Sequence, residues 1–284
     1  MHTLSLMTKE SIQGKKLLPG KDRLAFSLME RTLTSGHPLI LSDGESCILA
    51  QADITSPAWI WTRSDASDET LDGLLLALTA LYEQGRLTSV ISKGGISTLL
   101  SAAFDGRIKN RETLAVYCLD RLCPFHAEGE MIPGKDVPPE TAGAMIRWLA
   151  EFAGEKISYE TQRDMGLLFT QNENAYAWRT PNGEIVSVAK IAYSDSRFAD
   201  IHSVFTLEEM RNRGYAKALL TGMCERILET EKTPMLYADR DYAPSNHMYR
   251  QLGFTEKARL SALRLTRPGA VGNDATCASC GKEL

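Results

Sequence analysis

The segment Val204–Leu220 constrains the fold most, because it passes from an apolar strand pattern through a polar loop into a helix. Apolar residues at positions 216, 219, 220, 223 and 227 predict one buried helix face, with the helix beginning near Gly214. The first amides of a helix have no partner within it, and together with the helix dipole they favour an anion. The pattern therefore predicts a helix N-terminus that binds a phosphate or diphosphate.

Three residues at this helix start support an anion site. Gly214 has no Cβ to keep a ligand away from the backbone, and Arg211 and Arg213 add positive charge nearby. The alternative is a plain surface loop, because glycine is common near helix ends and arginine is usually solvated. The loop by itself leaves both interpretations open.

The composition is that of a globular protein, with 43% hydrophobic and 24% charged residues in a chain of 284. The 32 Lys and Arg against 36 Asp and Glu give a net charge of −4, which argues against general nucleic-acid binding. The longest apolar run, Leu71–Tyr82, is too short to cross a bilayer, and the N-terminus lacks the order of a secretory signal. We expect a cytoplasmic protein with no membrane partner, whose six cysteines are reduced thiols.

Hydrophobic periodicity predicts strands and helices along the chain. The predicted helices cover Lys21–Arg31, Asp68–Leu81, Gly94–Phe104, Glu140–Phe152, Gly214–Glu229 and Ser245–Gln251. The predicted strands cover Pro38–Leu41, Cys47–Ala50, Trp59–Thr62, Thr88–Ser92, Thr113–Leu119, Leu167–Phe169, Ala175–Arg179, Ile185–Ala192, Ile201–Thr206, Met235–Ala238 and Lys257–Leu265. Pro181-Asn182-Gly183 predicts a hairpin turn.

A dense run of proline and glycine between Pro124 and Pro139 predicts a linker between two halves. We expect an N-terminal α/β domain over 1–130, a second domain over 131–267 and a flexible tail over 268–284.

Both halves contain a strand followed by a short loop and a helix. In the first half this is the strand ending at Thr62 and the helix at Asp68, and in the second it is the strand ending at Thr206 and the helix at Gly214. A tandem duplication explains the shared order, and chance similarity between two α/β halves is the alternative.

A second informative block follows the helix that begins at Gly214. Ser245-Asn246 is followed by Tyr249 and then by Gly253-Phe254, on a short predicted helix that the glycine ends. Together with Arg211-x-x-Gly214-x-Ala216, this block resembles the acyl-CoA motif of the GCN5-related N-acetyltransferase (GNAT) superfamily, with one residue fewer between the asparagine and the tyrosine.

The resemblance covers about residues 135–267 and implies a GNAT fold. That fold is of the α/β (α+β) class, with a mixed, mostly antiparallel sheet flanked by helices. With the shared order of the two halves, it also implies a tandem arrangement whose first domain is a degenerate GNAT-like repeat.

The resemblance further implies an acyl-CoA-dependent N-acyltransferase, with acetyl-CoA as cosubstrate and a small-molecule or peptide amine as acceptor. Backbone groups of the strand before the loop would pair with the pantetheine arm and the thioester, and amides of the loop and first helical turn would hold the diphosphate. Asn246 would bond the pantetheine arm, and Tyr249 would lie near the sulfur as a catalytic donor. The cofactor-binding residues so implied are Val204, Phe205, Thr206, Arg211, Asn212, Arg213, Gly214, Tyr215, Ala216, Lys217, Asn246 and Tyr249.

An amine acceptor such as a lysine side chain needs a base, because presenting it neutral at pH 7 costs about 4–5 kcal/mol. Asp200 lies where some family members place a glutamate base, and His202 carries an imidazole suited to proton transfer. Asp239, at the end of the next predicted strand, is a third candidate that would act through water. The structural alternatives are a turn cap for Asp200 and a packed histidine for His202.

The first half lacks the matching parts of the motif. The loop after Thr62 contains Asp65, Asp68 and Glu69 and no glycine, so its charges would repel a diphosphate. We expect this half not to bind CoA, and either to shape the acceptor site or to serve a structural role.

The tail carries Cys277-x-x-Cys280, which is half of a zinc site. The other ligands would come from Cys118, Cys123 and His126, or from a second chain. An unligated pair in a mobile tail is the favoured alternative, so we assign no metal.

Two functions from other classes stay open beside the enzyme. One is a non-catalytic regulator that binds acyl-CoA, and the other is a protein-interaction module that uses the tail.

Overall fold

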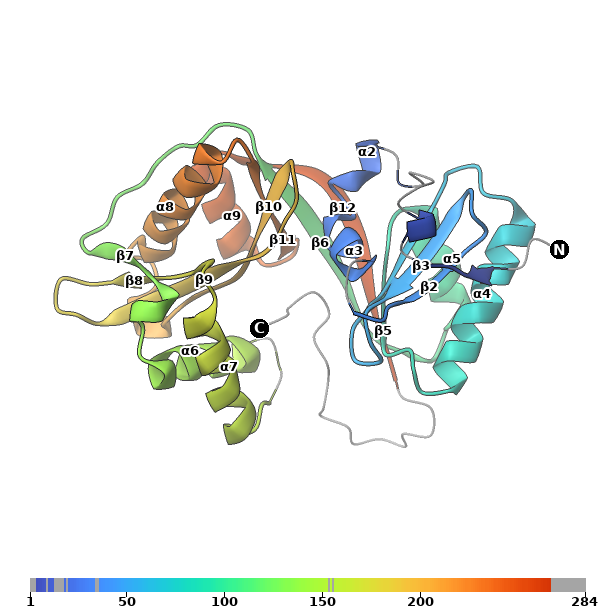
Figure 1. The fold of residues 1–284 in the computed structure, drawn as a ribbon, viewed down its shortest axis with the longest axis horizontal. Coiled ribbons are helices and arrows are strands. Elements are labelled where there is room, and N and C mark those ends of the chain that lie inside the picture. Colours follow the sequence, from blue (N-terminus) through green and yellow to red (C-terminus); the bar gives the residue numbers. More distant parts are fainter. Residues whose placement is uncertain are drawn as a thin grey trace. The chain divides into compact units, whose positions relative to one another are not determined.

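The structure is a computed structural model of the chain, and it describes residues 4–8, 10–12, 18, 20–33, 36–152, 154 and 156–266. The described residues form two compact units. The first holds those up to Val116, together with Asp239–Asp241 and the residues from Ala258 on. The second holds Tyr117–Ala238 and Tyr242–Lys257. Figure 1 shows the helices and strands of each unit.

The elements of the first half of the chain are β1 (Ser5–Leu6), α2 (Gly20–Arg23), α3 (Ser27–Leu33), β2 (Leu39–Ser42), β3 (Cys47–Gln51), β4 (Ala58–Thr62), α4 (Asp68–Glu83), β5 (Ser89–Ser92), α5 (Gly95–Ala103) and β6 (Ile108–Leu119). Those of the second half are β7 (Glu130–Pro133), the 3₁₀ turn η1 (Gly134–Asp136), α6 (Pro139–Phe152), α7 (Tyr159–Gln171), β8 (Ala175–Arg179), β9 (Ile185–Ser194), β10 (Phe198–Thr206), the 3₁₀ turn η2 (Glu208–Met210), α8 (Tyr215–Glu229), β11 (Thr233–Asp239), α9 (Ala243–Leu252) and β12 (Phe254–Leu265).

Each unit is built on a mixed, mostly antiparallel sheet. The strand order is β1-β2-β3-β4-β5-β12-β6 in the first unit and β11-β10-β9-β8-β7 in the second. Strands β4 and β5 are parallel, and so are β10 and β11. The strands that precede each parallel pair form antiparallel meanders.

The two units repeat one order of elements. The series β1, α2–α3, β2, β3, β4, α4, β5, α5 of the first corresponds to β7, α6–α7, β8, β9, β10, α8, β11, α9 of the second. The parallel pairs also begin alike, with Ala58 opposite Val90 in the first unit and Phe198 opposite Thr233 in the second. The shared order that the sequence predicts is therefore confirmed, and it extends to every strand of the two meanders.

Apolar helix faces packed on the sheets form the two cores. In the first unit Leu74 and Leu78 of α4 pack against Ile60 of β4, and in the second Met145 and Ile146 of α6 join the cluster around Phe205. These side chains are nearly or fully buried, and removing so much apolar surface from water drives the packing. Figure 1 shows α8 on one side of strands β8 and β9, and the α6–α7 pair on the other.

One predicted strand is wrong, because Leu167–Phe169 lies within helix α7. Ser158 caps this helix, since its Oγ accepts the amide of Thr161 at 3.1 Å. Gly166 lies so close to the carbonyl oxygen of Pro139 that a Cβ there would overlap it. Close packing of α7 on α6 stabilises the helix, and a short apolar window does not reveal such packing.

The predicted linker between Pro124 and Pro139 contains regular structure, so that prediction is also wrong in part. Strand β7 lies within it and pairs with β8, with Ile132 opposite Ala177. The predicted helix over Lys21–Arg31 is interrupted by a turn at residues 24–26, which separates α2 from α3.

The domain limits 1–130 and 131–267 stay a prediction. The second unit begins at Tyr117, and the described residues 258–266 lie in the first. The reason is the pairing of Ser261–Arg264 of β12 with Ser89–Ser92 of β5.

In the part of the chain that the structure describes, no helix is both long enough and apolar enough to cross a membrane. The predicted tail over 268–284, with Cys277 and Cys280, lies outside the described residues.

Candidate active site

The parallel pair β10–β11 separates soon after it begins. Among the described residues, their ladder covers only Phe198–Asp200 of β10 and Thr233–Met235 of β11, although β10 continues to Thr206 and β11 to Asp239. The end of β10, Val204–Thr206, therefore lies beyond this ladder. An extended ligand that pairs with a strand needs such a segment beside it.

A bulge in β10 lies beside this opening. Between His202 and Phe205 the strand advances three residues, while its partner β9 advances two, from Lys190 to Val188. Ser203 takes up the extra residue with a φ of 54°, a conformation that costs energy for a side chain other than glycine. Bulges of this kind re-aim neighbouring groups and often lie next to active sites.

Helix α8 begins beyond the end of β10. Its N-cap is Gly214, with a φ of 85°, and no side chain caps this end. The first turn contains no acidic residue, so the positive end of the helix dipole keeps its charge. Asn212 also has a left-handed backbone, with a φ of 63°, and such reversals turn successive amides toward one side of a loop. This end of α8 fits the anion site that the sequence predicts.

The reason for a glycine at 214 differs from the one predicted. A Cβ there would overlap the ring of Phe125, whose Cζ would be 2.6 Å away. The amide of Phe125 is itself fixed by a 3.0 Å hydrogen bond to Oγ1 of Thr221 on α8. Gly214 thus makes room for a protein side chain and supplies the positive φ, rather than only clearing the way for a ligand.

The basic side chains of the loop make contacts within the second unit. Arg211 donates from Nε to the carbonyl oxygen of Thr206 at 3.3 Å, and its guanidinium lies 5.3 Å from the ring of Phe152 and 5.8 Å from that of Phe205. Arg213 donates to the carbonyl oxygen of Glu209 at 3.3 Å.

Lys217 joins α8 to α9. Its Nζ lies 4.1 Å from the ring centroid of Phe125 and 3.2 Å from Oε1 of Gln251. Tyr215 and Ala216, like Lys217, belong to the first turn of α8, where helix geometry leaves the amides without an intrahelical acceptor.

The strand residues Val204, Phe205 and Thr206 are held from the β9 side. The hydroxyl of Ser187 donates to the carbonyl oxygen of Phe205 at 2.9 Å and lies 2.9 Å from Oγ1 of Thr206. Phe205 is also part of the core with α6. Its side chain is therefore a packing residue of this core.

Two of the candidate bases lie together. Oδ2 of Asp200 is 4.0 Å from Nε2 of His202, and both side chains are almost fully buried. The third candidate, Asp239, accepts the amide of Asp241 at 2.9 Å and is grouped with the first unit.

Helix α9 carries Asn246 and Tyr249, both buried. Nδ2 of Asn246 donates to the carbonyl oxygen of Tyr242 at 2.8 Å, so the amide is engaged within its own helix turn. The ring of Tyr249 lies 5.9 Å from that of Tyr117 and 6.1 Å from that of Phe254. Burial, with a further contribution from Tyr117, raises the pKa of the Tyr249 phenol well above its usual range.

Three aromatic residues beside the motif were not predicted from the sequence. Phe125, Phe152 and Tyr117 come from segments distant in sequence from the motif and contact Gly214, Arg211 and Tyr249. No local pattern marks them, because an aromatic residue in a loop or at a helix end has no characteristic spacing.

Among the described residues, no group of three or more His, Cys, Asp or Glu side chains is placed to hold a metal ion. Of the predicted zinc partners, Cys118 is buried and Cys123 is exposed. Burial raises the pKa of the Cys118 thiol.

Comparison with known proteins supports the fold. Residues 165–262 match the family model described as FR47-like protein. A GCN5-related N-acetyltransferase from Sphaerobacter thermophilus superposes with a TM-score of 0.66 at 15% identity, over 96% of this chain and 98% of its own. One from Kribbella flavida gives 0.62 at 18% identity, over 89% and 97%. A tandem GNAT protein from the clavulanic acid biosynthesis pathway gives 0.56 at 14% identity, over 94% and 99%.

The chain has the fold of the GCN5-related N-acetyltransferases, and the resemblance predicted for its second half is confirmed. The similarity to these solved structures covers nearly the whole chain, so the first half shares in it. No curated protein sequence matches the chain.

Proposed function

We propose that the second unit is an acyl-CoA-dependent N-acyltransferase that uses acetyl-CoA and acts on a primary amine of a small molecule or peptide. The observation that carries the proposal is the separation of β10 from β11 after a short ladder, together with the uncapped N-terminus of α8, which follows β10 in the chain. An extended chain with an anionic end fits such a site, because strand amides and helix amides satisfy its two parts.

The binding residues divide by these two parts. Backbone groups of Val204, Phe205 and Thr206 would pair with the pantetheine arm, and the amides from Arg211 to Lys217 would hold the diphosphate. The acidic residues nearest in sequence, Glu208 and Glu209, lie in η2 before the loop rather than in the first turn of α8. The first turn of α8 therefore holds no carboxylate that would repel the bound diphosphate.

Bound acetyl-CoA supplies an activated acyl group, and the chain must supply proton transfer and charge stabilisation. An amide of β10 near Phe205 would stabilise negative charge on the acyl oxygen, because the bulge turns part of this strand out of the ladder. His202 would accept the proton of the amine, and Asp200, 4.0 Å away, would orient the imidazole and favour its charged form.

Tyr249 would act on the leaving sulfur by hydrogen bonding rather than by full proton transfer. A phenol of ordinary pKa is already a weaker acid than a thiol by about 1.5 units, or roughly 2 kcal/mol. Burial raises the pKa of Tyr249 further, so complete transfer from it becomes less favourable. Hydrogen bonding to a developing thiolate needs no such transfer.

Two measurements test this function together. Calorimetric titration with acetyl-CoA reports binding, and thiol release against a panel of small amines and peptides reports turnover. We expect Asp200→Asn and His202→Gln each to lower kcat at least tenfold with little change in the Kd of acetyl-CoA, while His37→Gln, at an exposed position of the first unit, changes neither.

The outcomes separate the alternatives. Binding without amine-dependent thiol release would favour a non-catalytic acyl-CoA-binding regulator. Absence of binding to acetyl-CoA would contradict both the enzyme and the acyl-CoA-binding regulator, and only the protein-interaction module would remain.

A further inference from the structure

The first unit contains a pocket of about 680 Å³ at the ends of β4 and β5, where α4 and α5 begin. In the repeated order of elements, this place corresponds to the opening between β10 and β11. Its volume lies in the range of small-molecule sites. The proposed acyl transfer in the second unit does not use it.

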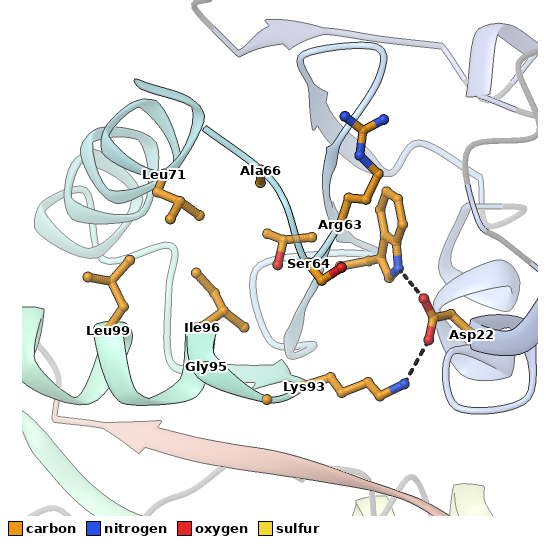
Figure 2. Close-up of a pocket in the computed structure, with 12 residues that line it drawn as sticks. Asp22, Arg63, Ser64, Ala66, Leu71, Lys93, Gly95, Ile96 and Leu99 are labelled. Carbon is orange, nitrogen blue, oxygen red and sulfur yellow. Dashed lines mark hydrogen bonds and ion pairs between the residues drawn. The ribbon is translucent and has the colours of Figure 1, made fainter. Parts of the chain in front are cut away.

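The lining of the pocket has two different sides (Figure 2). Leu71 at the start of α4 faces Ile96 and Leu99 at the start of α5, and these three make an apolar wall. Asp22 and Lys93 lie at the other side with their side chains directed toward each other. An amphipathic ligand fits such a division, with its polar head and its apolar body on opposite sides.

The charge of Asp22 is already compensated within the protein. Its carboxylate accepts Nζ of Lys93 at 2.7 Å and the indole N–H of Trp61 at 3.0 Å, and its side chain is nearly buried. Arg63 also lines the pocket, so the charged lining groups are one acid and two bases. This excess favours a ligand with a negative head.

The partner of Arg63 is exchangeable. Arg63 is paired with Asp65, whose side chain is 70% exposed. Such a surface ion pair contributes at most about 1 kcal/mol, because water screens it. The carboxylate of a bound ligand can therefore replace Asp65 at little cost.

The starts of α4 and α5 at the pocket differ in how well they attract a negative charge. Helix α4 is capped by Ser67, whose Oγ accepts the amide of Thr70 at 3.2 Å, and its first turn contains Asp68 and Glu69. Helix α5 begins after Gly94 with no side-chain cap and no acidic residue in its first turn. Of these two helices, α5 is the one whose first amides have no side-chain cap and whose positive dipole end has no nearby carboxylate in its first turn.

We propose that this pocket binds a small carboxylate with an apolar chain. The carboxylate lies at the start of α5 near Lys93 and Arg63, and the chain lies against Leu71, Ile96 and Leu99. Both simple carboxylic acids and apolar amino acids have this chemistry. The proposal is independent of whether the second unit transfers an acyl group.

Calorimetric titration of the full chain tests the ligand class. The probes are butanoate, hexanoate and octanoate, with hexanamide as the uncharged counterpart that is not a primary amine. We expect binding to tighten about threefold to fourfold for each added methylene, as for burial of one CH₂ group, and hexanamide to bind at least tenfold more weakly than hexanoate. Failure of every carboxylate to bind, or equal binding of hexanamide, overturns the proposal.

A matched pair of ligands distinguishes the two sources. L-Leucine and 4-methylpentanoate differ only in the ammonium group. Tighter binding of L-leucine that Gly95→Glu weakens assigns the pocket to amino acids, and equal or tighter binding of 4-methylpentanoate assigns it to simple acids. Either result supports a carboxylate site.

A substitution at Gly95 locates the binding. A Cβ at Gly95 has no atom within 4 Å, and its φ is not positive, so the pocket can receive a side chain there without strain. Gly95→Glu places a negative charge in the first turn of α5, where it favours the helix but repels the ligand. We expect at least tenfold weaker binding of octanoate than in Gly95→Gln, which has the same size, with an unchanged or higher Tm.

The control is Gly36→Glu, at an exposed glycine outside the pocket that likewise has no atom within 4 Å of a built Cβ. It should bind octanoate as the unmodified chain does. Equal affinity in Gly95→Glu and Gly95→Gln would show that the site does not select for negative charge, and would overturn the assignment.

Discussion

The ring of Phe125 lies against Gly214, close enough that Phe125 Cζ would be 2.6 Å from a Cβ at that position. This contact fixes the turn that enters α8 through packing within the protein. Gly214 also has a φ of 85°, which side chains other than glycine adopt at a cost. Two separate causes therefore require glycine here.

Gly214→Ala should lower the free energy of unfolding by about 2–4 kcal/mol, the sum of a backbone cost near 1 kcal/mol and an overpacking cost of about 1–3 kcal/mol. Denaturant unfolding measures it. In a Phe125→Ala background the overpacking cost disappears, so the same substitution should cost only about 1 kcal/mol. Equal costs in the two backgrounds would contradict the role of Phe125.

Ala216→Glu separates cofactor binding from helix stability at the N-terminus of α8. A carboxylate in the first turn interacts favourably with the helix dipole but should repel a diphosphate, and Ala216→Gln shares any packing cost of the longer side chain at this half-buried position. We expect the Kd of acetyl-CoA to rise at least tenfold relative to Ala216→Gln, measured by calorimetry. If both variants bind acetyl-CoA alike, the diphosphate does not lie at this helix end.

Tyr249 should contribute to the alkaline sensitivity of the protein. Burial raises its pKa in the folded state, so its contribution to stability is present below the unfolded pKa of about 10 and is lost as the pH rises above it. Tyr249→Phe should therefore lose less stability than the unmodified chain when the Tm is followed from about pH 9 to about pH 11. Tyr159→Phe, at a residue 79% exposed, is the control and should behave like the unmodified chain.

Asp43 should make the first unit sensitive to acid. Burial by itself would raise the pKa of its carboxyl, but hydrogen bonds from the hydroxyl of Ser46 and from the amides of Glu45, Ser46 and Cys47 outweigh it and lower the pKa to about 2. Because the folded pKa is depressed, the stabilisation is present above the unfolded pKa of about 3.9 and is lost as the pH falls toward 2.

Asp43→Asn should therefore lower the free energy of unfolding at pH 7, and the difference from the unmodified chain should shrink below about pH 4. Urea unfolding at several pH values measures this. Asp72→Asn, at an exposed position of α4, serves as the control and should show no such trend. A difference that stays constant down to pH 2 would contradict the role given to the Asp43 hydrogen bonds.

Much of the fold was predictable because its signals are local. The spacing of Leu74 and Leu78 marks the buried face of α4, and Ser67 marks its start by a cap that the structure contains. The motif from Arg211 to Ala216 and the block from Ser245 to Phe254 are each short continuous segments, so the sequence shows them directly.

The errors arose where longer-range packing decides. Leu167–Phe169 forms a helix because α7 packs on α6, although the apolar triplet by itself resembles a strand. Ser203 gives no sign of its bulge, since the extra residue is defined only against the register of β9.

The sequence by itself determined most of the strands and helices and the resemblance to the GNAT fold, because each signal depends on residues within a few positions of one another. Only the tertiary structure decided three other features. The buried side chains of Asp200 and His202 lie 4.0 Å apart, β12 pairs with β5, and Lys93 donates a hydrogen bond to Asp22. Such contacts depend on strand register and on the closure of long loops, which the total free energy of folding selects and no local pattern encodes.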